Sequence, residues 1–208
     1  AGALIGSPSI SIHSACPTIG WNGCANRMTT VSWAFQVGAL AELGDDGLHK
    51  TDWMRDTFKD LSEDLAEANS EGKRLLVMFE QRGCIYCNKM HQEIFPIPEI
   101  DAYINENFYF VQINMFGDVE VTDFDGQALP EKDMVKKWSA MFTPTIMYFP
   151  EEVAEGITAP QAAIVQVPGA FGKWTTLDML TWINEKGYEG DEPFQKYHAR
   201  MLEKHMAD

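Results

Sequence analysis

The chain has 208 residues, of which 45% are hydrophobic and 12% aromatic, and its 31 acidic and 16 basic residues give a formal net charge of -15. This length and hydrophobic content allow one domain with a sizeable core, and the acidic excess argues against nucleic acid or an anionic membrane surface as a partner. No apolar run approaches the roughly 20 residues that span a bilayer, so we predict no membrane span.

Residues 1–46 show no sustained periodicity and are predicted to form an irregular N-terminal extension, followed by a domain over 47–208. Cys16 and Cys24 lie in a stretch of this extension rich in glycine, serine and proline. They are candidates for a structural disulfide, which would suit an oxidising compartment, or they are free thiols of a cytosolic protein. The apolar stretch 31–41 is either the remnant of an export signal or an ordered arm packed on the domain.

A helical pattern begins at Asp52 and ends in the turn residues 69–72, with Thr51 or Asp52 as its N-cap. Its predicted packing face consists of the apolar residues Trp53, Phe58, Leu61, Leu65 and Ala68. The later elements follow from apolar periodicity, β-forming residues and turn signals. In chain order they are a strand over 75–79, a helix over 84–95, a helical turn over 100–105, a strand over 108–113, a hairpin within 117–130, a helix over 131–138, strands over 145–149 and 163–167, and helices over 174–186 and 191–205.

This order of elements predicts an α/β fold with three layers, α/β/α, around a mixed central sheet. The strand 75–79 is expected to pair in parallel with 109–113, and the strand 145–149 to pair antiparallel with 163–167. The predicted core covers about 72–187, and the helix 191–205 is an extra C-terminal element.

Cys84 and Cys87 form a Cys-x-x-Cys motif directly after the strand 75–79. This motif at a strand-to-helix junction is typical of redox proteins. The first sulfur lies at a helix N-terminus, where free N–H groups and the helix dipole favour a thiolate. We therefore predict that Cys84 is the nucleophile and Cys87 the resolving thiol of a two-electron cycle. The alternative is an inert disulfide that only staples the fold.

Two further polar residues flank this motif. Glu80 lies four residues before Cys84 and, if it is buried near the thiols, is a candidate proton acceptor for Cys87. The alternative is a solvated carboxylate at the strand end. His91 lies seven residues after Cys84, two helical turns away, and we interpret it as a surface or core histidine that does not act on that sulfur.

Acidic residues gather in the predicted hairpin, at Asp118, Glu120, Asp123 and Asp125. Lys132 stands where an EF-hand loop would need its closing glutamate. We therefore interpret the hairpin as acidic and solvated rather than as a calcium site.

The strand 75–79, the Cys-Ile-Tyr-Cys motif at 84–87 and the Phe-Thr-Pro-Thr stretch at 142–145 together resemble the thioredoxin superfamily over roughly 50–187. The resemblance implies that Pro144 follows a cis peptide bond and faces the disulfide. Thr143 and Pro144 would then form a backbone ledge for the substrate chain, and Tyr86 is a further candidate for substrate contact. The alternative is an ordinary trans-proline at a strand start.

Within the superfamily, residues 79–83, Met90-His91 and 121–126 are most similar to exported bacterial thioredoxins of the periplasmic, SoxW type. This resemblance implies a periplasmic or otherwise exported protein, protein thiols and disulfides as substrates, and a membrane thiol-electron transporter as a donor. The chain differs from ordinary thioredoxin in carrying Gly83 in place of a tryptophan and Met78 in place of a buried aspartate.

We therefore predict a monomeric thiol–disulfide oxidoreductase without cofactor or metal, which reduces protein disulfides, with thiol oxidation or disulfide isomerisation as the alternatives. Two alternatives belong to other classes. One is a metal-binding protein that combines Cys84 and Cys87 with Cys16, Cys24 or His91. The other is a redox-inactive peptide-binding module of the same fold.

Overall fold

A five-stranded mixed sheet forms the centre of the computed structural model, which describes residues 41–207. Its strand order is β3 (Met54–Arg55), β5 (Phe108–Asn114), β4 (Arg74–Glu80), β8 (Thr145–Tyr148) and β9 (Val165–Pro168). Two small antiparallel sheets pair β1 (Glu42–Leu43) with β2 (His49–Lys50) and β6 (Glu120–Thr122) with β7 (Ala128–Pro130). The helices are α1 (Leu61–Ser70), α2 (Ile85–Lys89), the π-helical turn η1 (Met90–Ile94), α3 (Pro98–Asn107), α4 (Glu131–Lys137), α5 (Ala159–Ala162), α6 (Lys173–Asn184), the 3-10 turn η2 (Gly187–Glu189) and α7 (Phe194–His205).

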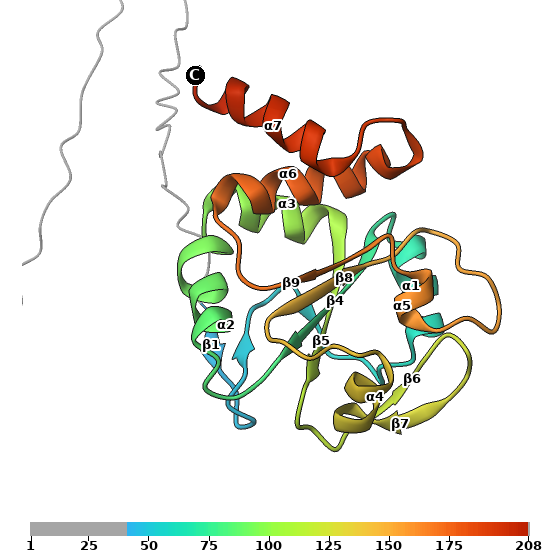
Figure 1. Cartoon of the computed structure of the whole chain (residues 1–208). Coiled ribbons are helices and arrows are strands. Elements are labelled where there is room, and N and C mark those ends of the chain that lie inside the picture. The colour runs from blue at the N-terminus through green and yellow to red at the C-terminus, as the bar shows by residue number, and fades with distance from the viewer. Residues whose placement is uncertain (1–40, 208) are drawn as a thin grey trace, which may run out of the picture. The chain divides into compact units, whose positions relative to one another are not determined.

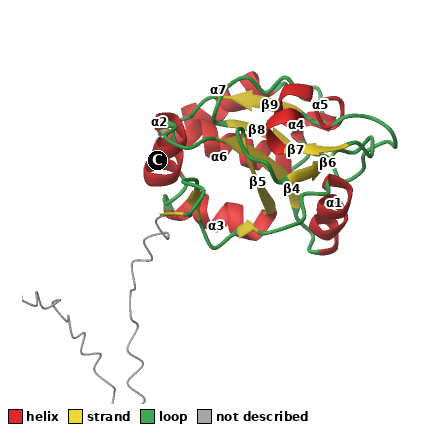
Figure 2. Ribbon diagram, turned by 90° about the horizontal axis from the view of Figure 1, so that it is seen from below, coloured by secondary structure: helices red, strands yellow, loops and turns green. Residues whose placement is uncertain are grey.

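Helices cover both faces of the sheet, so the fold has the three predicted layers (Figures 1 and 2). Alternate residues of β4 face opposite layers. Leu75, Val77 and Phe79 belong to an apolar cluster with residues of α1, α4 and α5. Leu76 and Met78 belong to a second cluster with residues of η1, α3, α6 and α7. Both faces of β4 are therefore core, which explains its continuous apolar run.

The predicted strand pairings are confirmed. β4 pairs in parallel with β5, with Leu75 opposite Tyr109 and Phe79 opposite Ile113. β8 pairs antiparallel with β9 and, on its other side, antiparallel with β4. The sheet is therefore mixed because the chain reverses direction after the parallel pair.

The prediction of a helix from Asp52 is wrong. Helix α1 begins only at Leu61, where the Asp60 carboxylate accepts hydrogen bonds from the backbone N–H groups of Ser62 and Glu63. The preceding stretch extends as β3 beside β5, and Lys59 has a left-handed φ of 58° that interrupts any helix at this point.

The apolar residues before α1 do not share one helical face. Trp53 is buried and its indole Nε1–H donates to Asp101 of α3 at 2.9 Å. Phe58 is 92% exposed and contributes nothing to the core. Of the five predicted face residues, only Leu61, Leu65 and Ala68 lie on the buried face of the helix.

Several boundaries near the predicted ones also move. The turn expected at 100–105 is a full helix, α3, which Pro98 can open because its missing N–H would have no helical partner there. The final helix begins at Phe194, three residues after the predicted start. Strand β1 lies within the segment 1–46 that was predicted as irregular.

The extra C-terminal helix α7 is fastened to α6 by a buried carboxylate. Asp178 is 2% exposed and accepts from His198 Nδ1 at 2.6 Å and from His205 Nε2 at 2.8 Å. The His205 ring also stacks on Trp174 of α6. Figure 1 shows α7 lying on α6, and α6 lying beside α3. Among the described residues, no helix has both the length and the apolar character needed to cross a bilayer.

A buried carboxyl in α1 gives a pH-dependent prediction. Burial raises the pKa of Asp64 to about 7, although the Thr57 hydroxyl donates a hydrogen bond that opposes the shift. The unfolded carboxyl has a pKa of about 3.9, so between about pH 4 and 7 the unfolded state binds fewer protons and stability falls as pH rises. We expect Asp64→Asn to be more stable than the parent at pH 8 by up to about 4 kcal/mol, and similar to it at pH 3.

Urea unfolding at the two pH values checks this expectation. The matched control is Glu63→Gln, because Glu63 is the exposed neighbour in the same helix turn. Equal stability of the Asp64→Asn variant and the parent at pH 8 would contradict it.

Candidate functional site

The candidate site lies where β4 leads into α2. Gly83 adopts a φ of +73°, a conformation that side-chain-bearing residues rarely reach. The chain then turns so that Cys84 becomes the N-cap of α2, with extended backbone at φ -71° and ψ 110°. The helical backbone continues through η1, where the Phe95 N–H bonds to the Met90 carbonyl five residues earlier.

Cys84 and Cys87 form a disulfide across the first turn of this helix. The Cys87 backbone N–H also donates to Cys84 Sγ at 3.0 Å. The two sulfurs differ in access, because Cys84 is 7% exposed and Cys87 is completely buried. Only Cys84 can therefore meet a partner from solvent first, as the spacing predicts. In the disulfide neither sulfur is the thiolate that zinc requires.

Exposed apolar side chains lie on the cysteine loop and on the segment before β8. Ile85 and Tyr86, between the two cysteines, are 80% and 63% exposed. Met141 and Phe142, which lead into β8, are also exposed. Exposed apolar side chains in contiguous loops mark interaction surfaces.

Pro144 lies on the segment that enters β8, and the Thr143–Pro144 peptide bond is cis. The register places Thr145 opposite Phe79, so Pro144 is level with the end of β4 from which the cysteine loop departs. The Gly169 N–H donates to the Pro144 carbonyl at 2.7 Å, which ties this segment to the end of β9. Thr143 and Pro144 therefore lie at the same end of the sheet as Cys84.

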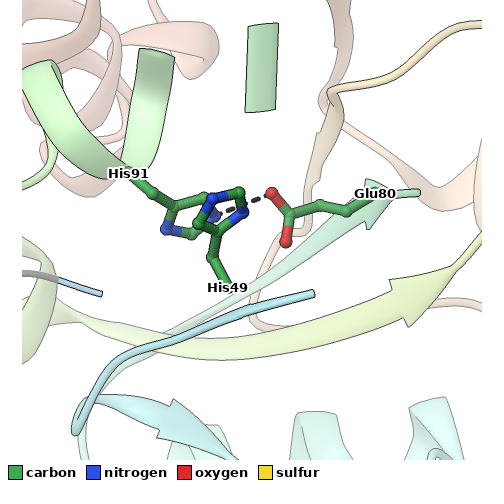
Figure 3. Close-up of side chains that lie close together, drawn as sticks. All are labelled: His49, Glu80 and His91. Atoms are coloured by element: carbon green, nitrogen blue, oxygen red, sulfur yellow. Dashed lines mark hydrogen bonds and ion pairs between the residues drawn. The ribbon is translucent and has the colours of Figure 1, made fainter. Parts of the chain in front are cut away.

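Glu80 is the last residue of β4 and is fully buried, so the alternative of a solvated carboxylate is wrong. Strand alternation places its side chain on the same face as Met78, beneath the helix that carries the cysteines. Its Oε1 lies 2.7 Å from His91 Nε2, as Figure 3 shows. His91 is also fully buried.

Gln112 of β5 sets the direction of the hydrogen bonds at Glu80. Its Oε1 accepts from the Lys50 ammonium at 2.6 Å, which identifies this atom as the amide oxygen. Its Nε2 therefore donates, to the His49 carbonyl at 2.8 Å and to Glu80 Oε2. Glu80 thus accepts from Gln112 on one oxygen and faces His91 with the other.

His49 of β2 completes this buried group. Its ring stacks on the His91 ring, with centroids 4.7 Å apart and an interplanar angle of 11° (Figure 3). Burial, together with repulsion from His91, lowers the pKa of His49 from its ordinary value. The His49 Nε2 lies 3.2 Å from Asn88 Oδ1 of α2. We call His49, Glu80 and His91 the buried triad.

The triad has residue types that bind metals, and its three ligand atoms lie within 4.8 Å of one another. However, an imidazole binds a metal through a lone pair in its ring plane. The two rings are nearly parallel and face each other, so their lone pairs cannot meet on one ion unless a ring turns. The arrangement fits hydrogen bonding and proton transfer better than metal binding.

Sequence reasoning missed most of this triad. The sequence prediction for His91 considers its spacing of seven residues from Cys84. His91 lies only four residues after Cys87, and this spacing places the His91 and Cys87 side chains on one helix face. His49 has no usable signal in the sequence, because the hydrogen bond from Gln112 and the stacking on His91 that place it here join residues far apart in sequence.

The acidic hairpin is only partly solvated. Asp118, Glu120 and Asp125 are exposed, but Asp123 is 1% exposed and accepts hydrogen bonds from Trp138 Nε1 and the Ala159 N–H. The interpretation of Asp123 as a solvated residue is therefore wrong.

Cys16 and Cys24, the candidates for a structural disulfide, lie outside the described residues.

Comparison with known proteins finds a family model and several similar structures. A family model described as a thioredoxin-like domain matches residues 61–164. No curated protein matches the sequence. A thioredoxin-fold protein from Helicobacter pylori is 20% identical, with 63% of this chain and 81% of that chain covered and a TM-score of 0.46. A thioredoxin from Thermus thermophilus is 18% identical, with 62% and 86% covered and a TM-score of 0.47. The oxidised C-terminal domain of DsbD from Neisseria meningitidis is 13% identical, with 60% and 90% covered and a TM-score of 0.37.

Proposed function

The chain belongs to the thioredoxin-like domain family, and on that premise we propose that it is a thiol–disulfide oxidoreductase that works through Cys84 and Cys87. The observation that carries the proposal is the disulfide at the first helix turn, with one accessible sulfur and one buried sulfur. This asymmetry assigns the two roles, because attack from outside can occur only at Cys84.

In the reducing direction, the Cys84 thiolate attacks a substrate disulfide and one substrate sulfur leaves as a thiolate. The product is a mixed disulfide between Cys84 and the other substrate sulfur. Cys87 then loses its proton and attacks Cys84 Sγ, and the second substrate thiolate leaves. Two electrons have moved to the substrate, and the Cys84–Cys87 disulfide remains. The same steps in reverse oxidise a dithiol.

The proposed substrate is a protein thiol or disulfide presented in an extended segment. Thr143 and Pro144 lie at the same end of the sheet as Cys84, and backbone groups of Thr143 would hydrogen-bond with an extended substrate chain there. Tyr86 and the other exposed apolar side chains of the two loops would cover apolar residues beside the substrate disulfide.

We favour reduction over oxidation or isomerisation, with electrons from a membrane thiol transporter. An exported, SoxW-type protein with a Cys16–Cys24 disulfide is part of the same proposal. Its support is the resemblance of residues 79–83 and 121–126 to exported thioredoxins. The roles assigned to Cys84 and Cys87 do not depend on the direction of electron flow or on where the protein is located.

The experiment that tests the proposal is a redox titration of the Cys84–Cys87 pair against glutathione, combined with an insulin-reduction assay. A potential near the thioredoxin value of about -270 mV, with insulin reduction, is expected for a reductase. A value near about -120 mV would instead indicate an oxidant. A pair that does not exchange with glutathione at all would contradict oxidoreductase function and favour a peptide-binding module.

A further inference from the structure

The complete burial of Cys87 poses a problem for the second step of the proposed reaction. A buried site disfavours a thiolate, because desolvation penalises the charged form. Cys87 must nevertheless lose its proton before it can attack the mixed disulfide. A base within the protein is therefore needed, and the buried triad is the polar group that lies beneath the same helix.

His91 is placed to receive that proton. It lies four residues after Cys87 along continuous helical backbone, so the two side chains share a face. Side chains on a helix lean back toward its N-terminus, over the residues three and four positions earlier. For His91 these are Asn88 and Cys87. The contact between Asn88 and the stacked His49 ring shows that the triad reaches this turn of the helix.

The hydrogen bonds define which nitrogen of His91 is free. Glu80 accepts from Gln112 on Oε2 and faces His91 Nε2 with Oε1. A carboxylate there accepts from His91 Nε2–H, and in neutral imidazole the other nitrogen is then an unprotonated acceptor. That nitrogen, Nδ1, is buried and has no partner among the described residues. Buried polar atoms without a partner are rare and call for an explanation.

We propose that His91 Nδ1 accepts the proton of Cys87, with Glu80 as a positioning residue that holds the imidazole and stabilises its charged form. This role rests on the proposed oxidoreductase function and extends it. The Cys87 S–H bond breaks and an N–H bond forms at His91. The Cys87 sulfur bonds to Cys84 Sγ, and the bond between Cys84 and the substrate sulfur breaks. The departing substrate thiolate or solvent later takes the proton from His91.

The groups around His91 allow its imidazole to accept one proton and to release it again. Within the described range 41–207, Glu80 on β4 supplies the one negative charge in direct contact, and His49 on β2 lies against the ring face. Lys50 on the same strand reaches the group only through Gln112, and Asp46 pairs with Lys50 at 3.1 Å. The Phe95 ring packs against the His91 ring in a T-shaped contact. A proton arriving at His91 therefore meets a carboxylate and is shielded from solvent.

Ellman's reagent separates the two steps of the reaction. In protein with Cys16 and Cys24 changed to serine, so that only the redox pair reacts, the reduced form should release one equivalent of thionitrobenzoate when Cys84 attacks the reagent, and a second when Cys87 resolves the mixed disulfide. In His91→Gln at pH 7 we expect the first release to keep its rate and the second to slow by roughly 100-fold or more, the range of general-base catalysis. His198→Gln, which changes a histidine of α7, is the matched control and should alter neither step.

The Glu80→Gln variant tests the positioning role through pH. Without the carboxylate the charged imidazole loses its stabilising partner, so the pH at which the second release reaches half its maximal rate should fall. A merely structural role for Glu80 would slow the second step without moving this midpoint. The pH midpoint measured for Glu80→Gln also tests the proposal if circular dichroism shows that the His91→Gln variant does not fold.

Three results would contradict the proposed role of His91 as the proton acceptor for Cys87. The second release could keep its rate in folded His91→Gln, or both releases could slow equally in it. The oxidised protein could also bind one equivalent of added Zn²⁺ that His91→Gln does not bind, which would make the triad a metal site. Absence of any release from the parent protein is different, because it would reject the proposed function itself.

Discussion

Serine at position 84 should reduce disulfide exchange to the rate of the blank reaction, the largest effect that we expect from any single substitution. Cys84 is the only sulfur of the pair that reaches the surface, and a hydroxyl is neither ionised near neutral pH nor able to form a disulfide. The insulin-reduction assay measures this loss. The Cys84→Ser variant should keep the fold, because the disulfide closes only the first turn of a helix.

Serine at position 87 should have a different outcome. The Cys84 thiol is retained, so one mixed disulfide per chain is expected to form with glutathione disulfide and to persist, because no second thiol resolves it. Intact-mass analysis counts the glutathione bound. The matched control is a variant with Cys16 and Cys24 both changed to serine, which should retain exchange. Accumulation of glutathione on Cys84→Ser would show that a different cysteine attacks first.

Alanine at position 123 should cause the largest loss of stability. Asp123 is almost completely buried and accepts hydrogen bonds from the Phe124 and Ala159 backbone N–H groups and from Trp138 Nε1, all at 2.7 to 2.8 Å. Its Oδ2 also pairs with Lys137 at 2.8 Å. Removing a buried charged acceptor leaves its donors unsatisfied, so we expect a loss of about 3–5 kcal/mol in the free energy of unfolding.

Urea unfolding followed by circular dichroism checks this loss. The control is Asp125→Ala, because Asp125 is exposed and pairs with the same Lys137. An exposed ion pair contributes at most about 1 kcal/mol, so this variant should stay near the parent. Similar losses in the two variants would show that Lys137 pairing, rather than burial of Asp123, is what matters.

Part of the candidate site is readable from local sequence. The apolar run of β4, the turn at Gly83 and the spacing of Cys84 and Cys87 define a strand, a tight turn and a helix start within about ten residues of chain. Local preferences of this kind do not depend on distant contacts. Pro144 is also found from sequence, through the resemblance of residues 142–145 to the thioredoxin superfamily.

The sequence prediction is wrong at two places, where the local residue pattern favours one structure and contacts with distant residues impose another. The stretch around Met54 has apolar residues at helical spacing, but pairing with β5 holds it extended. Asp123 lies among exposed acidic residues, yet contacts with Trp138 and Ala159 bury it. In both cases the deciding partners lie more than a dozen residues away, beyond the reach of a periodicity argument.

From its sequence alone, this protein can be assigned an α/β fold and a redox pair at a helix start, because both follow from local patterns of apolar and cysteine residues. The resemblance of residues 75–79, 84–87 and 142–145 to the thioredoxin superfamily adds the particular fold. Only the tertiary structure determines that Glu80 is buried, that His91 is its partner and that His49 stacks on the His91 ring. The reason is that desolvation and hydrogen-bond partners depend on which distant strands become neighbours, and these two factors control where a proton can reside.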